Sequence, residues 1–277
     1  KSRPKKSSAE KRMSSLKATF AVVTGSSQGL GKEIALQFAK VCDGETSVLV
    51  LHGRNEERLA AVHADIKAVN PLLTVCAVVA DLVEHESYKR LVEIFDEFGK
   101  QSFERAFLVH NAGDHMGFVK NKAHEIDDHQ AIQRFMSMHL TSMVVLTSNF
   151  MKKITSHALI KTKQYVVNVS SMSALVPMKT LALYCSAKAA REMFMQVLAL
   201  EDPEVRALNF DPAIMPTEML INHIRDAYDR DFARKLTKMG KDGEIFSAVK
   251  IAEEFIKVVI LDEWKSGEHV APCKFKV

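Results

Sequence analysis

The stretch ATFAVVTGSSQGLGKEIALQFAKV, residues 18–41, joins an apolar run to a glycine-rich turn and then to a segment of helical periodicity. The apolar run is nearly continuous, which is typical of a strand covered on both faces of a parallel sheet. Glycines at positions 25, 29 and 31 allow a tight turn and let a phosphate group approach the backbone where the helix begins. A strand, a glycine turn and a helix in this order predict the first unit of a dinucleotide-binding fold.

The same alternation of strand and helix continues along the chain. Each later apolar run is short, and the segments between the runs place apolar residues at i, i+3, i+4 and i+7. This order predicts a single doubly wound, Rossmann-type α/β domain with a mainly parallel sheet flanked by helices. The further runs are residues 47–53, 73–80, 105–113, 164–171 and 205–210, and the clearest helical segments are residues 30–41, 56–69 and 86–98.

The composition suits a globular protein with a sizeable core, since 47% of its 277 residues are hydrophobic. No apolar run approaches the roughly 18 residues that a membrane-spanning helix needs, and the first residues lack the apolar centre of a secretory signal. The cysteines form no CxxC pair and have no histidines at metal-ligand spacing; they are Cys42, Cys76, Cys185 and Cys273. We therefore expect a cytoplasmic protein with no metal site and no membrane association.

Residues 1–17 carry seven basic side chains and one acidic one. So short a charge run is typical of a solvated, disordered leader, although a basic tail can also contact nucleic acid or an acidic membrane surface. We give the tail no function, expect no nucleic-acid partner, and place the folded domain at residues 18–277.

Residues 217–242 interrupt the strand rhythm with a charged helical pattern, EMLINHIRDAYDRDFARKL at positions 218–236. Insertions over the edge of a sheet commonly cover a substrate site. We expect a helical substrate lid near residues 217–242, although a plain pair of surface helices would show the same pattern.

The end of the second predicted strand, His52-Gly53-Arg54-Asn55, bears on the choice of cofactor. In a dinucleotide fold this strand end meets the adenosine ribose. An acidic side chain there would accept hydrogen bonds from a free 2′-hydroxyl, whereas Arg54 offers a bidentate partner to a 2′-phosphate. Because no acid occurs at positions 52–55, the sequence favours NADPH/NADP+ over NAD.

A serine, a tyrosine and a lysine follow the predicted strand at 164–171. Ser171 ends that run, Tyr184 comes thirteen residues later, and Lys188 lies one helical turn beyond Tyr184 on the same helix face. A lysine ammonium beside a phenol lowers the pKa of the phenol, which suits a general acid for a carbonyl oxygen. A serine hydroxyl can hydrogen-bond the same oxygen. We therefore predict Ser171, Tyr184 and Lys188 as the catalytic residues.

Taken in order, these motifs resemble those of the short-chain dehydrogenase/reductase family. They are TGSSQGLG (24–31), NAG (111–113), Ser171, YCSAK (184–188), and Asp211-Pro212 followed by Thr217. Longer strings resemble the branch of that family that reduces a pterin ketone, namely HLTSM (139–143), NVSSMSAL (168–175), LALYCSAKAAREMFMQVLALE (181–201) and KSGEHV (265–270). The resemblance covers residues 18–271 and implies a seven-stranded sheet.

The resemblance implies an NADPH-dependent carbonyl reductase that reduces the side-chain ketone of a pterin, as in tetrahydrobiopterin biosynthesis. Tyr184 would protonate the ketone oxygen, Ser171 would orient it, and Lys188 would lower the Tyr184 pKa and hold the nicotinamide ribose. The substrate would contact Ser171, Tyr184, Met172 and Ala213. The cofactor would contact Gly25, Ser27, Gln28, Gly29, Leu30, Arg54, Asn55, Asp81, Leu82, Asn111, Ala112, Gly113, Tyr184, Lys188, Pro212, Thr217 and Met219.

The resemblance also implies a homodimer, formed through helices near residues 131–153 and 184–200. The many Met and Leu residues of these segments fit a contact between helices of two subunits, and they would equally suit an ordinary core.

The sequence departs from the family pattern at positions around the expected site. Gln28 stands where the family often has an arginine beside the 2′-phosphate, which leaves Arg54 to carry that preference. His110 and His139 replace two asparagines, and Ala213 replaces a glycine near the nicotinamide. Ala271 replaces the aspartate that anchors the pterin ring, and an alanine cannot accept hydrogen bonds from the pterin's donors.

Two alternatives therefore stay open. A reductase of other ketones or diketones would keep Ser171, Tyr184 and Lys188 while lacking the pterin anchor, as Ala271 suggests. A non-catalytic NADPH-binding protein would explain His139 and Ala213 but would not need an intact set of serine, tyrosine and lysine.

Overall fold

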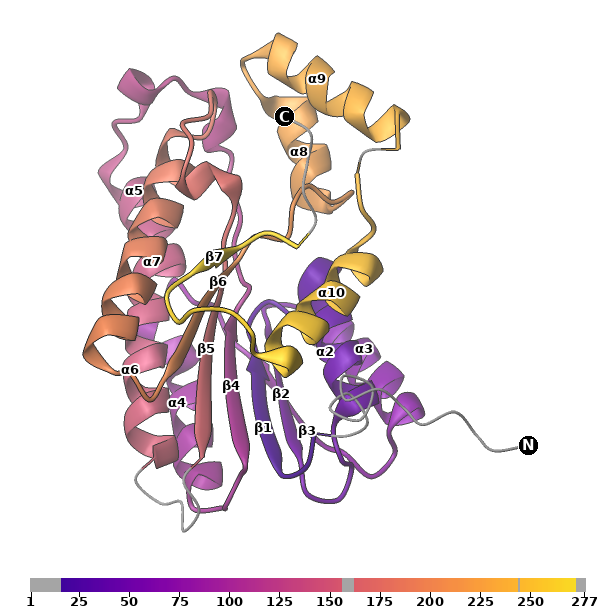
Figure 1. Ribbon diagram of the computed structural model, residues 1–277. Coiled ribbons are helices and arrows are strands. Elements are labelled where there is room, and N and C mark those ends of the chain that lie inside the picture. Colours follow the sequence, from indigo (N-terminus) through magenta and orange to yellow (C-terminus); the bar gives the residue numbers. More distant parts are fainter. Residues whose placement is uncertain (1–15, 156–161, 244, 273–277) are drawn as a thin grey trace.

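Figure 1 shows a central sheet with helices on both of its faces. The computed structural model describes residues 16–155, 162–243 and 245–272. Within these ranges a single parallel sheet has seven strands in the order β3-β2-β1-β4-β5-β6-β7. The strands are β1 (Thr19–Val23), β2 (Val48–Gly53), β3 (Thr74–Val79), β4 (Arg105–His110), β5 (Lys163–Val169), β6 (Arg206–Phe210) and β7 (His269–Val270). The predicted doubly wound α/β fold is confirmed, and the sheet is parallel throughout.

Burial explains why the strand sequences differ across the sheet. Every residue of the central strand β1 is buried, as are all residues of β5 after the first, and both strands are rich in apolar residues. Most of the edge strand β3 is exposed or half-buried. The opposite edge strand, β7, has only two residues, and its Val270 carbonyl accepts a hydrogen bond of 2.9 Å from Asp211 N.

Helices cover the two faces in separate groups, each packing its apolar side on the sheet. On one face, the ring of Phe38 of α2 contacts two other rings: its centroid is 5.3 Å from that of Phe107 and 6.3 Å from that of Phe255. On the other face, Phe20 of β1 contacts Phe95 of α4 with ring centroids 6.4 Å apart. The first group is α2 (Gly29–Val41), α3 (Glu56–Val69) and α10 (Ala248–Leu261), and the second is α4 (His85–Gly99), α6 (Ser142–Thr155) and α7 (Ala182–Glu201).

The segment at 217–242 folds as two helices, α8 (Glu218–Asp226) and α9 (Arg230–Lys241), beyond one end of the sheet (Figure 1). Each begins at a side-chain cap: Thr217 accepts a hydrogen bond from Leu220 N, and Asp229 accepts from Asp231 N. The remaining short helices follow strands β4 and β5. They are η1 (Phe118–Lys120), η2 (Ala123–Glu125), α5 (His129–Met136), the π-helical turn η3 (Ser137–Thr141) and η4 (Met172–Ala174).

The boundary of the basic tail is only partly visible. Leu16, which the sequence analysis assigns to the tail, is 3% exposed and forms a parallel bridge with Cys42. Residues 1–15 lie outside the described residues. Among the helices that the structure does describe, we find none long and apolar enough to cross a membrane.

Candidate active site

A cavity of about 430 Å³ lies at the ends of the central strands, where the glycine turn, the tyrosine helix and the start of α8 meet. It brings together almost every residue that the sequence assigns to the cofactor; only Asn55 of that set does not line it. Of the predicted catalytic residues, Tyr184 and Lys188 line the cavity and Ser171 does not. Ten further residues line the cavity for which the sequence predicted no role of their own: His52, Gly53, Asp114, Met138, Val169, Ser170, Met215, Pro216, Glu218 and Ala248.

The glycine turn is held against the end of β4. The Asn111 side-chain amide donates hydrogen bonds to Thr24 O (2.9 Å) and Gly25 O (3.1 Å). A Cβ on Gly31 would lie 2.3 Å from Gly25 O, so the turn closes only with glycine there, whereas a Cβ on Gly29 would meet Thr217 at 3.8 Å. The turn is therefore tight on its inner side and leaves room for ligand atoms above Gly29.

His52, in β2, holds the glycine turn in place by its hydrogen bonds. The imidazole Nδ1 accepts a hydrogen bond from Gly25 N (3.2 Å), and Nε2 lies 3.1 Å from Ala80 O. Burial lowers the pKa of His52 to about 4, so the ring is neutral at physiological pH and keeps Nδ1 free to accept. Sequence reasoning missed this residue because a histidine in a buried strand carries no motif.

Where β2 and β3 end, Arg54 lines the cavity together with Asp81 and Leu82. Asp81 is fixed by two contacts: its backbone N donates to Ser87 Oγ of α4 (2.7 Å), and its carboxylate accepts from Val83 N (3.0 Å). Asn55 instead caps α3 by accepting a hydrogen bond from Arg58 N (2.8 Å), which explains why it faces the helix and not the cavity.

Tyr184 and Lys188 lie on one face of α7, as their spacing predicts. Lys188 Nζ is 5.4 Å from the centroid of the Tyr184 ring and donates a hydrogen bond to Val169 O (2.6 Å). The direction of the Tyr184 pKa is opposite to the predicted one: burial raises the pKa of Tyr184 and outweighs the lowering effect of the Arg191 cation. Burial also lowers the pKa of Lys188 well below its usual value, because the ammonium is 2% exposed and faces a second cation, Arg191.

Arg191 is a buried arginine behind the tyrosine–lysine pair. It is 1% exposed, and its guanidinium donates to Asn168 Oδ1 (2.8 Å) and to the backbone oxygens of His110 (2.7 Å) and Ala112 (3.4 Å). Burial lowers its pKa to about 10, so it stays charged. Arg191 thus ties α7 to the end of β4, next to the asparagine that holds the glycine turn.

The two serines at the end of β5 have different partners. Ser171 caps η4 by accepting a hydrogen bond from Ser173 N (3.2 Å), which leaves its own hydroxyl proton available to a second acceptor. Ser170 is buried, lines the cavity, and donates a hydrogen bond to Glu192 Oε1.

His139, at the place of the family's asparagine, lies in the π-helical turn η3. It is fully buried, its Nε2 lies 2.6 Å from Asp114 O, and its ring stacks on Phe135 and meets the edge of Tyr184 at 5.7 Å. Burial lowers the pKa of His139 to about 3, so the ring is neutral. π-Helical turns often occur at functional sites, and this one places His139 against Tyr184.

Beneath the cavity, His269 of β7 lies between two buried acids. Its Nδ1 is 2.7 Å from Glu192 Oε1, and its Nε2 is 3.4 Å from Asp211 Oδ2. The ion pair with Asp211 and the hydrogen bond with Glu192 raise the pKa of His269 to about 9, so the ring is a cation at neutral pH. This cluster joins the short C-terminal strand to α7 and to Ser170 on the cavity wall.

Glu218 and Met219, at the start of α8, line the cavity together with the apolar Met138 and Met215. Ala227, between the two helices, packs with Val119 and Leu181 in a small cluster that also contacts Tyr184. Met172, a predicted substrate residue, is 37% exposed. The carboxylate of Asp114 is 43% exposed and lines the cavity.

Ala213 and Ala271 are the substituted positions near the expected substrate. Ala213 has φ 62°, a left-handed conformation that favours glycine and costs an alanine roughly 1 kcal/mol. Asp211 Oδ1 accepts a hydrogen bond from Ala213 N (2.9 Å) and holds this turn. Ala271 follows β7 directly, and Glu268 nearby folds back to accept from Lys265 N (2.8 Å).

Comparison with known proteins identifies the family. The sequence profile described as short chain dehydrogenase matches residues 19–227. Sepiapterin reductase of Bos taurus is 33% identical over 254 residues, covering 91% of this chain and 93% of that protein. Benzil reductase ((S)-benzoin forming) of Bacillus subtilis is 27% identical over 245 residues, covering 86% of this chain and 92% of that protein.

Among solved structures, L-sorbose reductase from Gluconobacter frateurii, complexed with NADPH and L-sorbose, has the same fold. It superposes with a TM-score of 0.73 at 21% identity, covering 94% of this chain and 96% of that one. The chain therefore belongs to the short-chain dehydrogenase/reductase family and is an oxidoreductase acting on CH–OH or C=O groups.

Proposed function

We propose that this protein is an NADPH-dependent ketone reductase of the sepiapterin reductase type. The observation that carries the proposal is a single cavity that joins the glycine turn to Tyr184 and Lys188. A cofactor cradle and an acid beside one cavity are what reduction of a carbonyl requires, because hydride delivery and protonation must occur on the same substrate.

Membership of the family implies a nicotinamide dinucleotide, and the residues present fit one. The room above Gly29 and the N-terminus of α2 suit a pyrophosphate. Arg54 supports NADPH over NADH, because it lines the adenosine end of the cavity, where a 2′-phosphate would need a cation. When bound, the cofactor supplies the hydride.

The protein's own part in the reaction is to position the ketone and to protonate its oxygen. Tyr184 is the proposed acid, and its raised pKa keeps the phenol protonated until negative charge develops on the ketone oxygen. Ser171, whose hydroxyl proton is free to donate, would orient that oxygen. Lys188 would hold the nicotinamide ribose, and its positive charge would favour loss of the tyrosine proton. The pair α8–α9 would act as the substrate lid, which its contact with the Tyr184 cluster supports.

We further propose a pterin ketone as the substrate. The relatedness to sepiapterin reductase over 91% of this chain supports this choice. The Asp114 carboxylate on the cavity wall offers an acceptor for the donors of a pterin, although it does not occupy the place of the family's aspartate, where Ala271 stands.

A second candidate is a reductase of diketones. Ala271 favours this candidate. Because the alanine replaces the family's aspartate, the pocket lacks the carboxylate that would bind the hydrogen-bond donors of a pterin ring. The similarity to benzil reductase over 86% of this chain is also in its favour.

The two substrates are separated by measuring NADPH oxidation with sepiapterin and with benzil in parallel. We expect a higher kcat/KM with sepiapterin, by roughly tenfold or more, because a donor-bearing ring that finds its acceptors gains at least one charge-assisted hydrogen bond. Turnover of benzil with little or none of sepiapterin would support the diketone reductase instead. NADPH binding without turnover of either would contradict both proposals.

The remaining parts of the proposal concern assembly and location. We propose a homodimer through α6 and α7, supported by an apolar stripe on α7 in which Met193, Val197 and Leu200 are 58%, 40% and 81% exposed.

A cytoplasmic location is proposed from the scattered cysteines of the sequence.

A further inference from the structure

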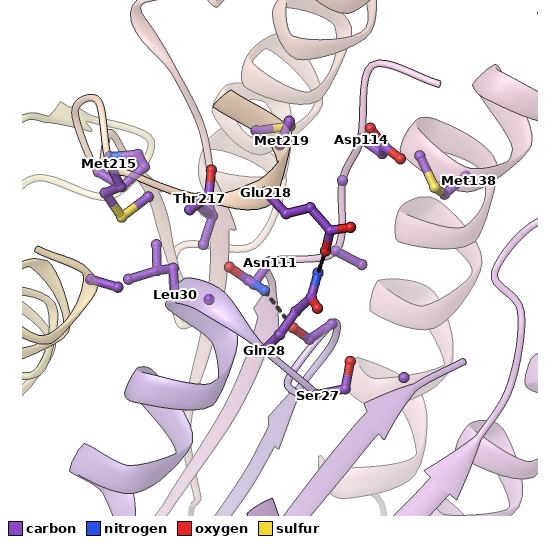
Figure 2. A pocket seen from close by; sticks show the side chains of 18 of the residues that line it. Ser27, Gln28, Leu30, Asn111, Asp114, Met138, Met215, Thr217, Glu218 and Met219 are labelled. Atoms are coloured by element: carbon purple, nitrogen blue, oxygen red, sulfur yellow. Dashed lines mark hydrogen bonds between the residues drawn. The ribbon is translucent and has the colours of Figure 1, made fainter. Parts of the chain in front are cut away.

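Three side chains from distant parts of the chain meet at the mouth of the cavity. Gln28 of the glycine turn donates a hydrogen bond to Glu218 Oε2 (3.1 Å), which Figure 2 shows as a contact reaching from the turn to the start of α8. Arg58 of α3 donates a hydrogen bond to Gln28 Oε1, and its NH1 lies 3.7 Å from Glu218 Oε2. Gln28 therefore holds a cation on one side and an anion on the other.

The contacts of Arg58 bring a second cation next to two residues that line the cavity, Gln28 and Glu218. Arg58 lies in the first turn of α3, the helix that begins two residues after Arg54. Arg54 and Gln28 both line the cavity, and Arg58, which is not among its lining residues, is hydrogen-bonded to Gln28. Gln28 does not use its side chain to cap α2, so the amide is free to hold Arg58 in this place.

A phosphate group can replace Glu218 as the partner of Arg58. The side chains of Arg58 and Glu218 are 54% and 61% exposed, and an exposed pair of this kind is worth little because water screens it. A phosphate dianion offers a guanidinium two charge-assisted hydrogen bonds and so competes well against one screened carboxylate.

Resting on the proposed use of NADPH, we propose that Arg58 is a second 2′-phosphate-binding residue and that Glu218 competes with the phosphate for it. Arg58 thereby supplies the charge that the glycine turn lacks at Gln28. The phosphate must therefore displace Glu218 in order to bind Arg58. A cofactor that carries the 2′-phosphate displaces Glu218, and a cofactor without this phosphate does not.

The test is the affinity for NADPH and for NADH, measured by isothermal titration calorimetry without a ketone. The ratio of the two dissociation constants isolates the phosphate contribution, since the cofactors share all other groups. Arg58→Met should weaken NADPH binding roughly tenfold and leave NADH binding unchanged. Glu218→Gln should tighten NADPH binding roughly threefold, with no effect on NADH. Arg58→Lys, which keeps the charge without the fork, should fall between Met and wild type.

Arg90→Met is the matched control, because Arg90 is also about half exposed (52%), pairs with glutamates, and lies on α4 away from the cavity. It should leave both affinities unchanged. An unchanged affinity ratio in Arg58→Met, or a Glu218→Gln change that affects NADPH and NADH equally, would overturn the role of Arg58 while leaving the reductase proposal intact. Failure of the wild-type protein to bind NADPH at all would overturn both.

Discussion

Replacing Tyr184 with phenylalanine is expected to slow ketone reduction by about 10²- to 10⁴-fold, the usual contribution of a positioned general acid. The phenol lies beside Lys188 on the cavity wall, with the lysine Nζ 5.4 Å from the ring centroid. Burial raises the pKa of the phenol, so the proton is in place at neutral pH. Phenylalanine keeps the ring contact with His139 and removes only the proton donor.

The measurement is the turnover rate at saturating NADPH and ketone, together with the dissociation constant for NADPH. Binding should be nearly unchanged, since the variant retains the glycine turn and Lys188. Tyr88→Phe is the control, because Tyr88 is a buried tyrosine of α4 that does not line the cavity. A Tyr184→Phe protein that keeps more than about a tenth of the wild-type rate would rule out Tyr184 as the acid.

Replacing His269 with alanine is expected to destabilise the fold by roughly 3 kcal/mol, because it leaves Glu192 and Asp211 as buried acids without their shared cation. For a chain of this length that corresponds to a fall in Tm of roughly 6–12 °C. Thermal unfolding followed by circular dichroism measures the change. His124→Ala, at a histidine whose side chain is 78% exposed, should shift Tm little.

The same histidine predicts how stability depends on pH. The folded-state pKa of His269 is raised to about 9, above its ordinary value of roughly 6.5. Its pairing therefore stabilises the protein fully below about pH 6.5, and that stability is lost as the pH rises through about 9. The wild-type Tm should fall across this range more steeply than that of His269→Ala. Parallel pH curves for the two proteins would show that His269 is not charged in the fold.

The sheet could be predicted because its central strands are buried on both faces. A strand such as β1 must then be apolar throughout, and the glycine turn after it has a sequence that few other structures require. The last strand was different: β7 has two residues, too few for any periodic pattern, and only the resemblance to a known family implied a seventh strand.

The sequence predicted those residues of the site that lie close together along the chain. Tyr184 and Lys188 share a helix face because they are one turn apart, and the structure places both on the cavity. Residues that act through contacts distant in sequence gave no local signal. His52 reaches Gly25 across 27 positions and His269 reaches Glu192 across 77, so neither pairing could be read from spacing.

The direction of the Tyr184 pKa could not be predicted from the sequence either. The spacing of Tyr184 and Lys188 indicates a neighbouring cation, but it gives no measure of how much water the fold removes. In the structure the phenol is buried, and this burial outweighs the lowering effect of the nearby Arg191 cation on the pKa of Tyr184.

Isotope transfer tests ketone reduction at this cavity most directly. The protein would be given sepiapterin with NADPH deuterated at the transferable position of the nicotinamide, and the alcohol product analysed by mass spectrometry. We predict deuterium on the carbon that was the ketone, in a reaction that Tyr184→Phe nearly abolishes. A product without deuterium at that carbon, or labelled product formed equally fast by Tyr184→Phe, would contradict the proposed reaction.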